Sequence, residues 1–85
     1  MIPAADRWGP FAANLEPAER LARLRAFRAL ARVYCGPRGA DLCRLLALAE
    51  ADASALEPAA AALNRLAATD RRNLLASYTR LNQAA

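Results

Sequence analysis

The 85-residue chain is basic and contains neither histidine nor lysine: arginines account for all 12 of its basic residues, against eight acidic ones, for a net charge of +4. The missing imidazole and amine remove the usual general base at neutral pH and the nucleophile of Schiff-base chemistry. The acidic residues are scattered along the chain. We therefore predict a single domain that is not an enzyme and uses no cofactor or metal ion.

The composition favours helices over sheets. Hydrophobic residues make up 56% of the chain, most of them alanine and leucine, and β-branched residues are few. No apolar run approaches the roughly 18 residues that a membrane-spanning helix needs. The N-terminus lacks the basic and apolar segments of a signal peptide, and two cysteines are too few for a disulfide scaffold. These features predict an all-α, cytoplasmic protein of bacterial type.

Residues 1–14 are predicted to form an irregular arm in front of a helical domain of residues 15–85. The arm contains two prolines and a glycine, together with Trp8 and Phe11. The simpler interpretation is that it folds back over the helices as a lid. If the two aromatic side chains are free instead, they are candidate anchors for a protein partner, because such residues often dominate interfaces.

A first helix is predicted over residues 17–35. Glu16 suits the positive end of the helix dipole, Pro17 suits the first helical position, and Gly36 is typical of a helix end. Apolar residues recur at spacings of three and four, as they do on the buried face of a helix. The predicted core face consists of Leu21, Leu24, Phe27, Leu30, Ala31 and Tyr34.

Arg25, Arg28 and Arg32 are predicted to form a ridge along this helix, because they are three and four residues apart. One interpretation is a solvated face whose alkyl stems cover the edge of the core. The other is a contact surface for an acidic partner, with Arg20 and Arg23 as further candidates. Binding to an anionic membrane is not favoured, because the aromatic residues of the core face would have to be free.

A second, mostly buried helix is predicted over residues 42–52, with Asp41 as its N-cap. Its predicted core face consists of Leu42, Leu45, Leu46 and Ala49, and Leu48 widens this face. The GPRG segment before it lacks the spacing of a phosphate-binding loop. Cys35 and Cys43 lie on either side of this segment and are most simply small buried hydrophobic residues. A reversible disulfide and a metal ion shared between subunits are the alternatives.

A third helix is predicted over residues 58–68 and a fourth over residues 70–81. Pro58 favours the start of the third helix, although the S-x-x-E pattern just before it offers a competing start. The alanines of this helix suggest that the other three enclose it. Thr69 is predicted to cap the fourth helix. The predicted core residues of the fourth helix are Leu74, Leu75, Tyr78 and Leu81.

The last two helices also allow a helix-turn-helix interpretation, with residues 67–70 as the turn. The turn has no glycine and Asp70 would repel phosphate, so a plain helical hairpin is favoured. In the helix-turn-helix interpretation, the candidate nucleic-acid-binding residues are Arg71, Arg72, Asn73 and Arg80.

Together these patterns predict a compact four-helix bundle-like domain with an irregular N-terminal arm. The expected role is that of a small adaptor or regulatory module. It would bind a protein partner, or a second copy of itself, through the basic face of the first helix. A DNA- or RNA-binding regulator is the alternative.

Overall fold

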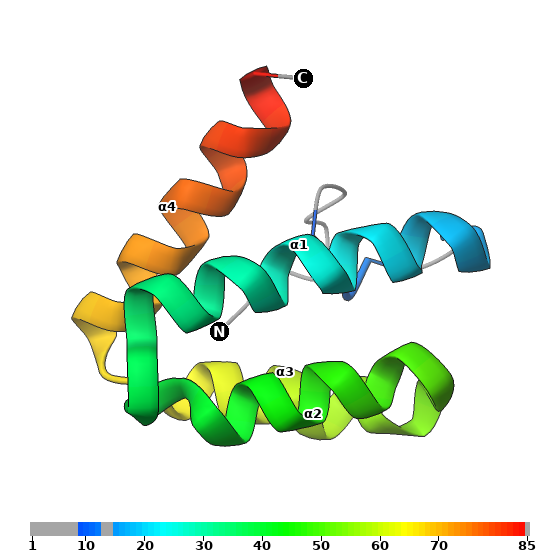
Figure 1. Ribbon diagram of the computed structural model, residues 1–85, viewed down its shortest axis with the longest axis horizontal. Coiled ribbons are helices and arrows are strands. Elements are labelled where there is room, and N and C mark those ends of the chain that lie inside the picture. The colour runs from blue at the N-terminus through cyan, green and yellow to red at the C-terminus, as the bar shows by residue number, and fades with distance from the viewer. Residues whose placement is uncertain (1–8, 13–14, 85) are drawn as a thin grey trace.

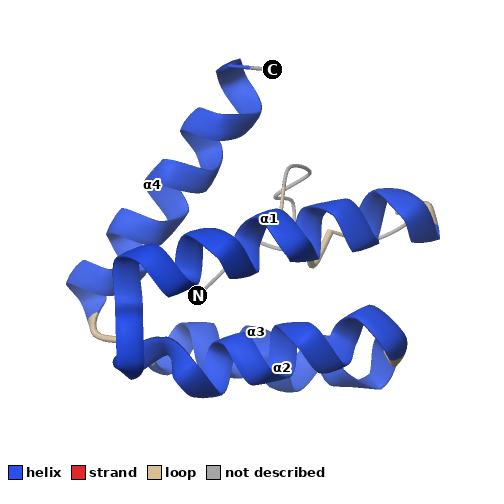
Figure 2. Ribbon diagram, in the orientation of Figure 1, coloured by secondary structure: helices blue, strands red, loops and turns tan. Residues whose placement is uncertain are grey.

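The computed structural model of the protein describes residues 9–12 and 15–84, and the side chains up to residue 81. This part of the chain contains helices and turns but no strand (Figures 1 and 2), which confirms the all-α prediction. None of its helices is long and apolar enough to cross a membrane. The elements are α1 (Pro17–Cys35), the 3-10 turn η1 (Gly36–Gly39), α2 (Ala40–Ala51), the 3-10 turn η2 (Ala53–Ala55), α3 (Leu56–Arg65) and α4 (Ala68–Ala84).

Helix α1 has the bounds that the sequence predicts. Pro17 is its first residue, and Glu16 before it is extended, with a φ of −61° and a ψ of 145°. Gly36 follows the last residue with a φ of 55° and a ψ of −137°, a conformation that a residue with a Cβ rarely adopts. The chain therefore leaves α1 at a glycine and enters η1 at once.

Helix α2 begins two residues earlier than predicted, so Asp41 lies inside its first turn and is not the N-cap. The turn η1 runs directly into α2 without an intervening extended residue. Its backbone already approximates a helix, so no side-chain cap is needed at this junction. The Asp41 carboxylate instead accepts a hydrogen bond from Arg44 Nη2 at 2.6 Å.

The predicted bounds of the last two helices are also wrong by two or three residues. Helix α3 starts two residues before Pro58, because η2 supplies its first turn. The Asp52 carboxylate organises η2 by accepting hydrogen bonds from the Ser54 amide at 2.9 Å and from its hydroxyl at 2.7 Å. Helix α4 starts at Ala68, so Thr69 is a helical residue and not the cap.

Each of the first three helices packs on the next one in the chain, and the fourth packs on the first. Helix α1 packs on α2, α2 packs on α3, and α4 returns to pack on α1. Figure 1 shows α2 and α3 side by side below α1, whereas α4 rises from one end and diverges. The predicted four-helix bundle is therefore not confirmed. The expectation that α3 is enclosed is wrong, because α3 packs mainly on α2 and Ala61 is exposed.

Phe27 lies at the centre of the core. Its ring makes edge-to-face contacts with Phe11 of the arm, at a centroid distance of 6.1 Å, and with Tyr78 of α4, at 5.1 Å. The arm, α1 and α4 therefore meet at one aromatic side chain. The other fully buried large side chains of the helices are Leu24, Leu42, Leu46, Leu63 and Leu74.

Three predicted core residues lie at the surface. Tyr34 is 42% exposed, because the stripe of α1 drifts around the helix and Cys35 takes the buried position in the last turn. Leu81 is 50% exposed, since the C-terminal part of α4 diverges from α1 (Figure 1). Leu48, expected on the buried side of α2, is also 50% exposed.

Candidate functional site

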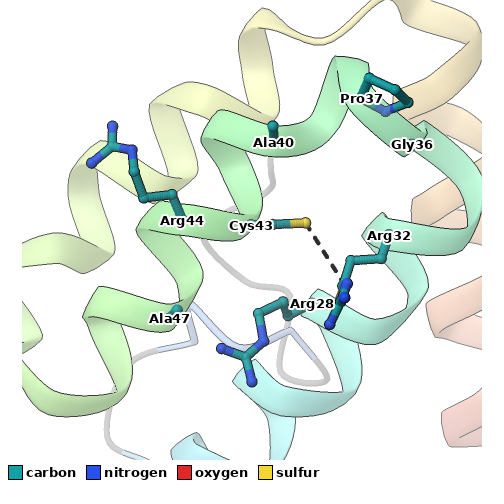
Figure 3. Close-up of a pocket in the computed structure, with 8 residues that line it drawn as sticks. All are labelled: Arg28, Arg32, Gly36, Pro37, Ala40, Cys43, Arg44 and Ala47. Atoms are coloured by element: carbon teal, nitrogen blue, oxygen red, sulfur yellow. Dashed lines mark hydrogen bonds between the residues drawn. The ribbon is translucent and has the colours of Figure 1, made fainter.

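An open groove runs between α1 and α2 and ends at η1 (Figure 3). Its volume is about 610 Å³. Its lining residues are Arg28, Arg32, Gly36, Pro37, Ala40, Cys43, Arg44 and Ala47.

The floor of the groove is formed by one face of α2. Ala40, Cys43 and Ala47 are spaced by three and four residues, so they lie in one row along the helix. The Cys43 thiol points towards α1 (Figure 3) and donates a long hydrogen bond to the backbone oxygen of Arg28 at 4.0 Å. Burial raises the pKa of the Cys43 thiol, against the opposing effect of Arg32 and Arg28. The floor therefore consists of small, apolar and uncharged side chains.

Arginines from both helices form the rim of the groove. Arg28 and Arg32 come from α1, and Arg44 comes from α2 on the other side of Cys43 (Figure 3). None of the lining residues in the described structure is acidic. The rim is therefore a concentration of positive charge around an apolar floor.

The acidic residues near the rim are too few to neutralise it. Glu50 is shared by two arginines, since its carboxylate lies 3.0 Å from Arg25 Nε and 3.0 Å from Arg28 Nη1. Asp41 pairs with Arg44, and its Oδ2 also lies 3.5 Å from Nη2 of Arg65. Arg32 forms no ion pair with a carboxylate in the part of the chain that the structure describes.

Arg20 and Arg23 do not extend the ridge, because they hold the arm. Arg20 Nη1 donates to the Pro10 carbonyl at 2.7 Å, and Arg23 Nη1 donates to the Gly9 carbonyl at 3.3 Å. Phe11 packs on the core, with a cavity of only about 40 Å³ beside it. This part of the arm behaves as the lid that the sequence suggests. Trp8 lies outside the described residues.

Both cysteines are free thiols. Cys35 is 2% exposed, and burial raises its pKa, with Asp70 and Cys43 adding to the effect and Arg38 opposing it. Thiols held in the neutral form are poor nucleophiles. The arrangement suits the interpretation of both residues as small hydrophobic side chains.

The candidate nucleic-acid residues of α4 are divided between two tasks. Arg71 Nη1 donates to the Asn64 carbonyl at 3.0 Å and to the Leu66 carbonyl at 3.1 Å, so this side chain ties the end of α3 to α4. Arg72, Asn73 and Arg80 are exposed on the outer face of α4.

Asp70 is only 8% exposed, whereas its expected repulsion of phosphate, which counted against the helix-turn-helix interpretation, required it to face solvent. Its carboxylate accepts two hydrogen bonds from Arg38, from Nε at 2.7 Å and from Nη2 at 3.0 Å. These hydrogen bonds lower the pKa of Asp70 against the effect of its burial. The pair borders a second cavity of about 290 Å³, where the other charged residues are Asp41 and Arg65.

Sequence reasoning found the α1 part of the groove and missed the α2 part. The spacing of Arg28 and Arg32 marks one side of a helix, which a sequence shows directly. Arg44 joins them only because α2 packs antiparallel to α1 across η1 (Figure 1). The available signal was the short turn between the two helices, which brings their facing sides together.

No protein-family model, curated protein or solved structure matches the chain.

Proposed function

We propose that the protein is a non-enzymatic adaptor or regulatory module that binds an acidic protein partner through the basic side of α1. Arg25, Arg28 and Arg32 supply the α1 contacts, and Arg44 adds a contact from α2. The observation that carries this proposal is an open groove lined by Arg28 and Arg32 on one side and Arg44 on the other, without acidic lining residues in the described structure. Guanidinium groups attract carboxylates and orient them by paired hydrogen bonds.

The ion pairs of these arginines contribute little to the stability of the fold. Exposed ion pairs contribute only about 0–1 kcal/mol to stability, and Arg32 lacks even that contribution from a carboxylate in the described residues. The two free thiols suit a reducing compartment such as the cytoplasm.

The proposal is tested by comparing two double variants with the same change in charge. In the groove variant, Arg32→Glu and Arg44→Glu reverse two rim charges. In the control, Arg72→Glu and Arg80→Glu reverse two exposed charges on α4. The probe is a glutamate-rich peptide of about 20 residues, with affinity measured by fluorescence anisotropy. We expect the groove variant to bind about tenfold more weakly or worse, since each lost pair and new repulsion costs affinity.

The control variant should retain wild-type affinity within about a factor of three, a small free-energy change. Equal losses in both variants would mean that only net charge matters, which contradicts a site on α1. Circular dichroism establishes that both variants are folded. Light scattering on the same samples distinguishes a separate partner from a second copy of the chain.

The alternative function is DNA or RNA binding through α4. It is favoured by the burial of Asp70 against Arg38, which removes the acidic group that would repel phosphate. It is weakened by the engagement of Arg71 with the end of α3. The same two variants test it with a duplex DNA probe. If the protein binds nucleic acid, its affinity for the DNA should fall as the salt concentration rises, with a log–log slope of about −0.9 per phosphate contact. The α4 variant should also lose more affinity for the DNA than the groove variant does.

A further inference from the structure

The floor and the rim of the α1–α2 groove differ in chemistry. Ala40, Cys43 and Ala47 give the floor a neutral, apolar surface that is partly open to solvent. The rim on both sides is cationic. At the end of the groove, a Cβ placed on Gly36 would meet nothing within 4 Å, so this end is open. A ligand that matches the groove needs an apolar centre with negative charge on both flanks.

The groove has room for a ligand larger than a single anionic group. Its volume is about 610 Å³ and it is open to solvent, so a ligand would lie along it. The floor runs from Ala40 to Ala47, which corresponds to about 11 Å along a helix axis. This length matches about two helical turns of a binding partner.

We infer that the groove binds an acidic amphipathic helix of the partner protein, with its apolar side chains on the floor of Ala40, Cys43 and Ala47 and its flanking carboxylates on Arg32 and Arg44. This inference rests on the proposed function and specifies the chemistry of the partner. Helices that lay an apolar face into a groove contact it with side chains at positions i, i+3, i+4 and i+7. Two turns supply these positions. Figure 3 shows Arg32 on the α1 side of Cys43 and Arg44 on the other side, with the Arg44 guanidinium directed away from Arg28 and Arg32. The two polar edges of such a helix would lie at these two positions.

The test uses two synthetic peptides of about 14 residues, near the shortest length that forms a helix in water. The first has leucines at helical spacing and glutamates elsewhere. In the second, glutamine replaces every leucine, which keeps the charge and a similar helix propensity. We expect the leucine peptide to bind about tenfold more tightly or better, because its apolar side chains become buried in the groove.

Cys43 provides a direct readout of the floor, because its side chain lines the groove. Alkylation by iodoacetamide at alkaline pH, where part of the thiol is ionised, is resolved for each cysteine by mass spectrometry. It should slow at Cys43 by about a factor of five or more when the leucine peptide saturates the protein. The glutamine peptide should give little protection. Cys35 is buried and should react slowly in every sample.

Ala47→Phe fills the floor without changing the charge, and Ala61→Phe is the matched control on the exposed side of α3. We expect only Ala47→Phe to weaken the leucine peptide, by about tenfold, and to bring it to the affinity of the glutamine peptide. The Cys43 protection of the wild-type protein decides the question if Ala47→Phe does not fold.

The two proposals fail in different ways. If both peptides bind equally and both lose affinity in the Arg32→Glu, Arg44→Glu variant, the basic site stands and the amphipathic helix is overturned. Unchanged Cys43 alkylation under the saturating leucine peptide overturns it as well. If neither peptide binds, or if binding ignores the two rim arginines, the proposed function falls together with the inference.

Discussion

Gly39 sets how closely the turn η1 approaches the last turn of α1. A Cβ built on Gly39 would lie 2.6 Å from Cβ of Cys35 and 3.6 Å from its Sγ. Both residues are buried, so neither atom can move into solvent. The contact therefore holds the corner from which α2 runs back along α1, and with it the end of the groove.

We predict that Gly39→Ala lowers the free energy of unfolding by about 1–3 kcal/mol, because overpacking at a buried contact forces the backbone apart. Urea denaturation followed by circular dichroism measures the change. The control is the double variant with Cys35→Ala, which removes Sγ but keeps Cβ. It should not restore stability. Full rescue by Cys35→Ala would show that Sγ, and not Cβ, restricts the approach.

At the scale of the elements, the ion pair between Arg38 and Asp70 joins η1 to the first turn of α4. It is bidentate, and the carboxylate also lies near the positive end of the α4 dipole. Helix α4 also packs on α1, and Arg71 ties its start to the end of α3. The Arg38–Asp70 pair adds an attachment of the start of α4 to the corner between the first two helices.

We predict that Asp70→Asn lowers the melting temperature at pH 7 and reduces the acid sensitivity of the fold. The pKa of Asp70 in the folded protein lies below the ordinary value of 3.8. The stabilisation is therefore complete above that ordinary value and is lost as the pH falls through the folded pKa. Thermal melts between pH 7 and pH 2 should show a wild-type loss below about pH 4 that is smaller in the variant.

Asp52→Asn is the matched control, because its carboxylate organises only η2. Amide hydrogen exchange should accelerate at the start of α4 in Asp70→Asn and stay unchanged there in Asp52→Asn. Identical exchange of α4 in the two variants would contradict the attachment role of Asp70.

The helices themselves were predictable, whereas their ends and contacts were not. Pro17 and Gly36 act locally, through a missing N–H and a positive φ, so they indicated the bounds of α1 correctly. Asp41 and Thr69 also fit local cap patterns, but Asp41 follows a turn that is already helical and Thr69 lies inside α4. Arg44, the arginine that α2 contributes to the candidate site, lies there because of how α1 and α2 face each other. The periodicity within one helix does not predict how two helices face each other.

At the scale of the whole molecule, Phe27 of α1 joins this helix to the arm and to α4, through ring contacts that the sequence did not predict. Its ring contacts the arm through Phe11 and α4 through Tyr78, while it belongs to α1 itself. The α1–α2 pair and the α2–α3 pair are joined by short turns along the chain. The position of α4 relative to α1, by contrast, depends on contacts between distant residues, among which these rings are central.

We predict that Phe27→Ala costs about 3–5 kcal/mol, which is a large share of the roughly 4–13 kcal/mol expected for a domain of this size. Phe27→Leu should cost less, about 1–3 kcal/mol, because it keeps an apolar side chain but loses two aromatic contacts of about 0.5–1.5 kcal/mol each. Val33→Ala, at a position that is 76% exposed, should change stability by less than about 0.5 kcal/mol. Urea denaturation ranks the three variants, and hydrogen exchange in Phe27→Leu should increase in α4 more than in α2. A Phe27→Ala midpoint equal to that of Val33→Ala would mean that α4 is held without this aromatic side chain.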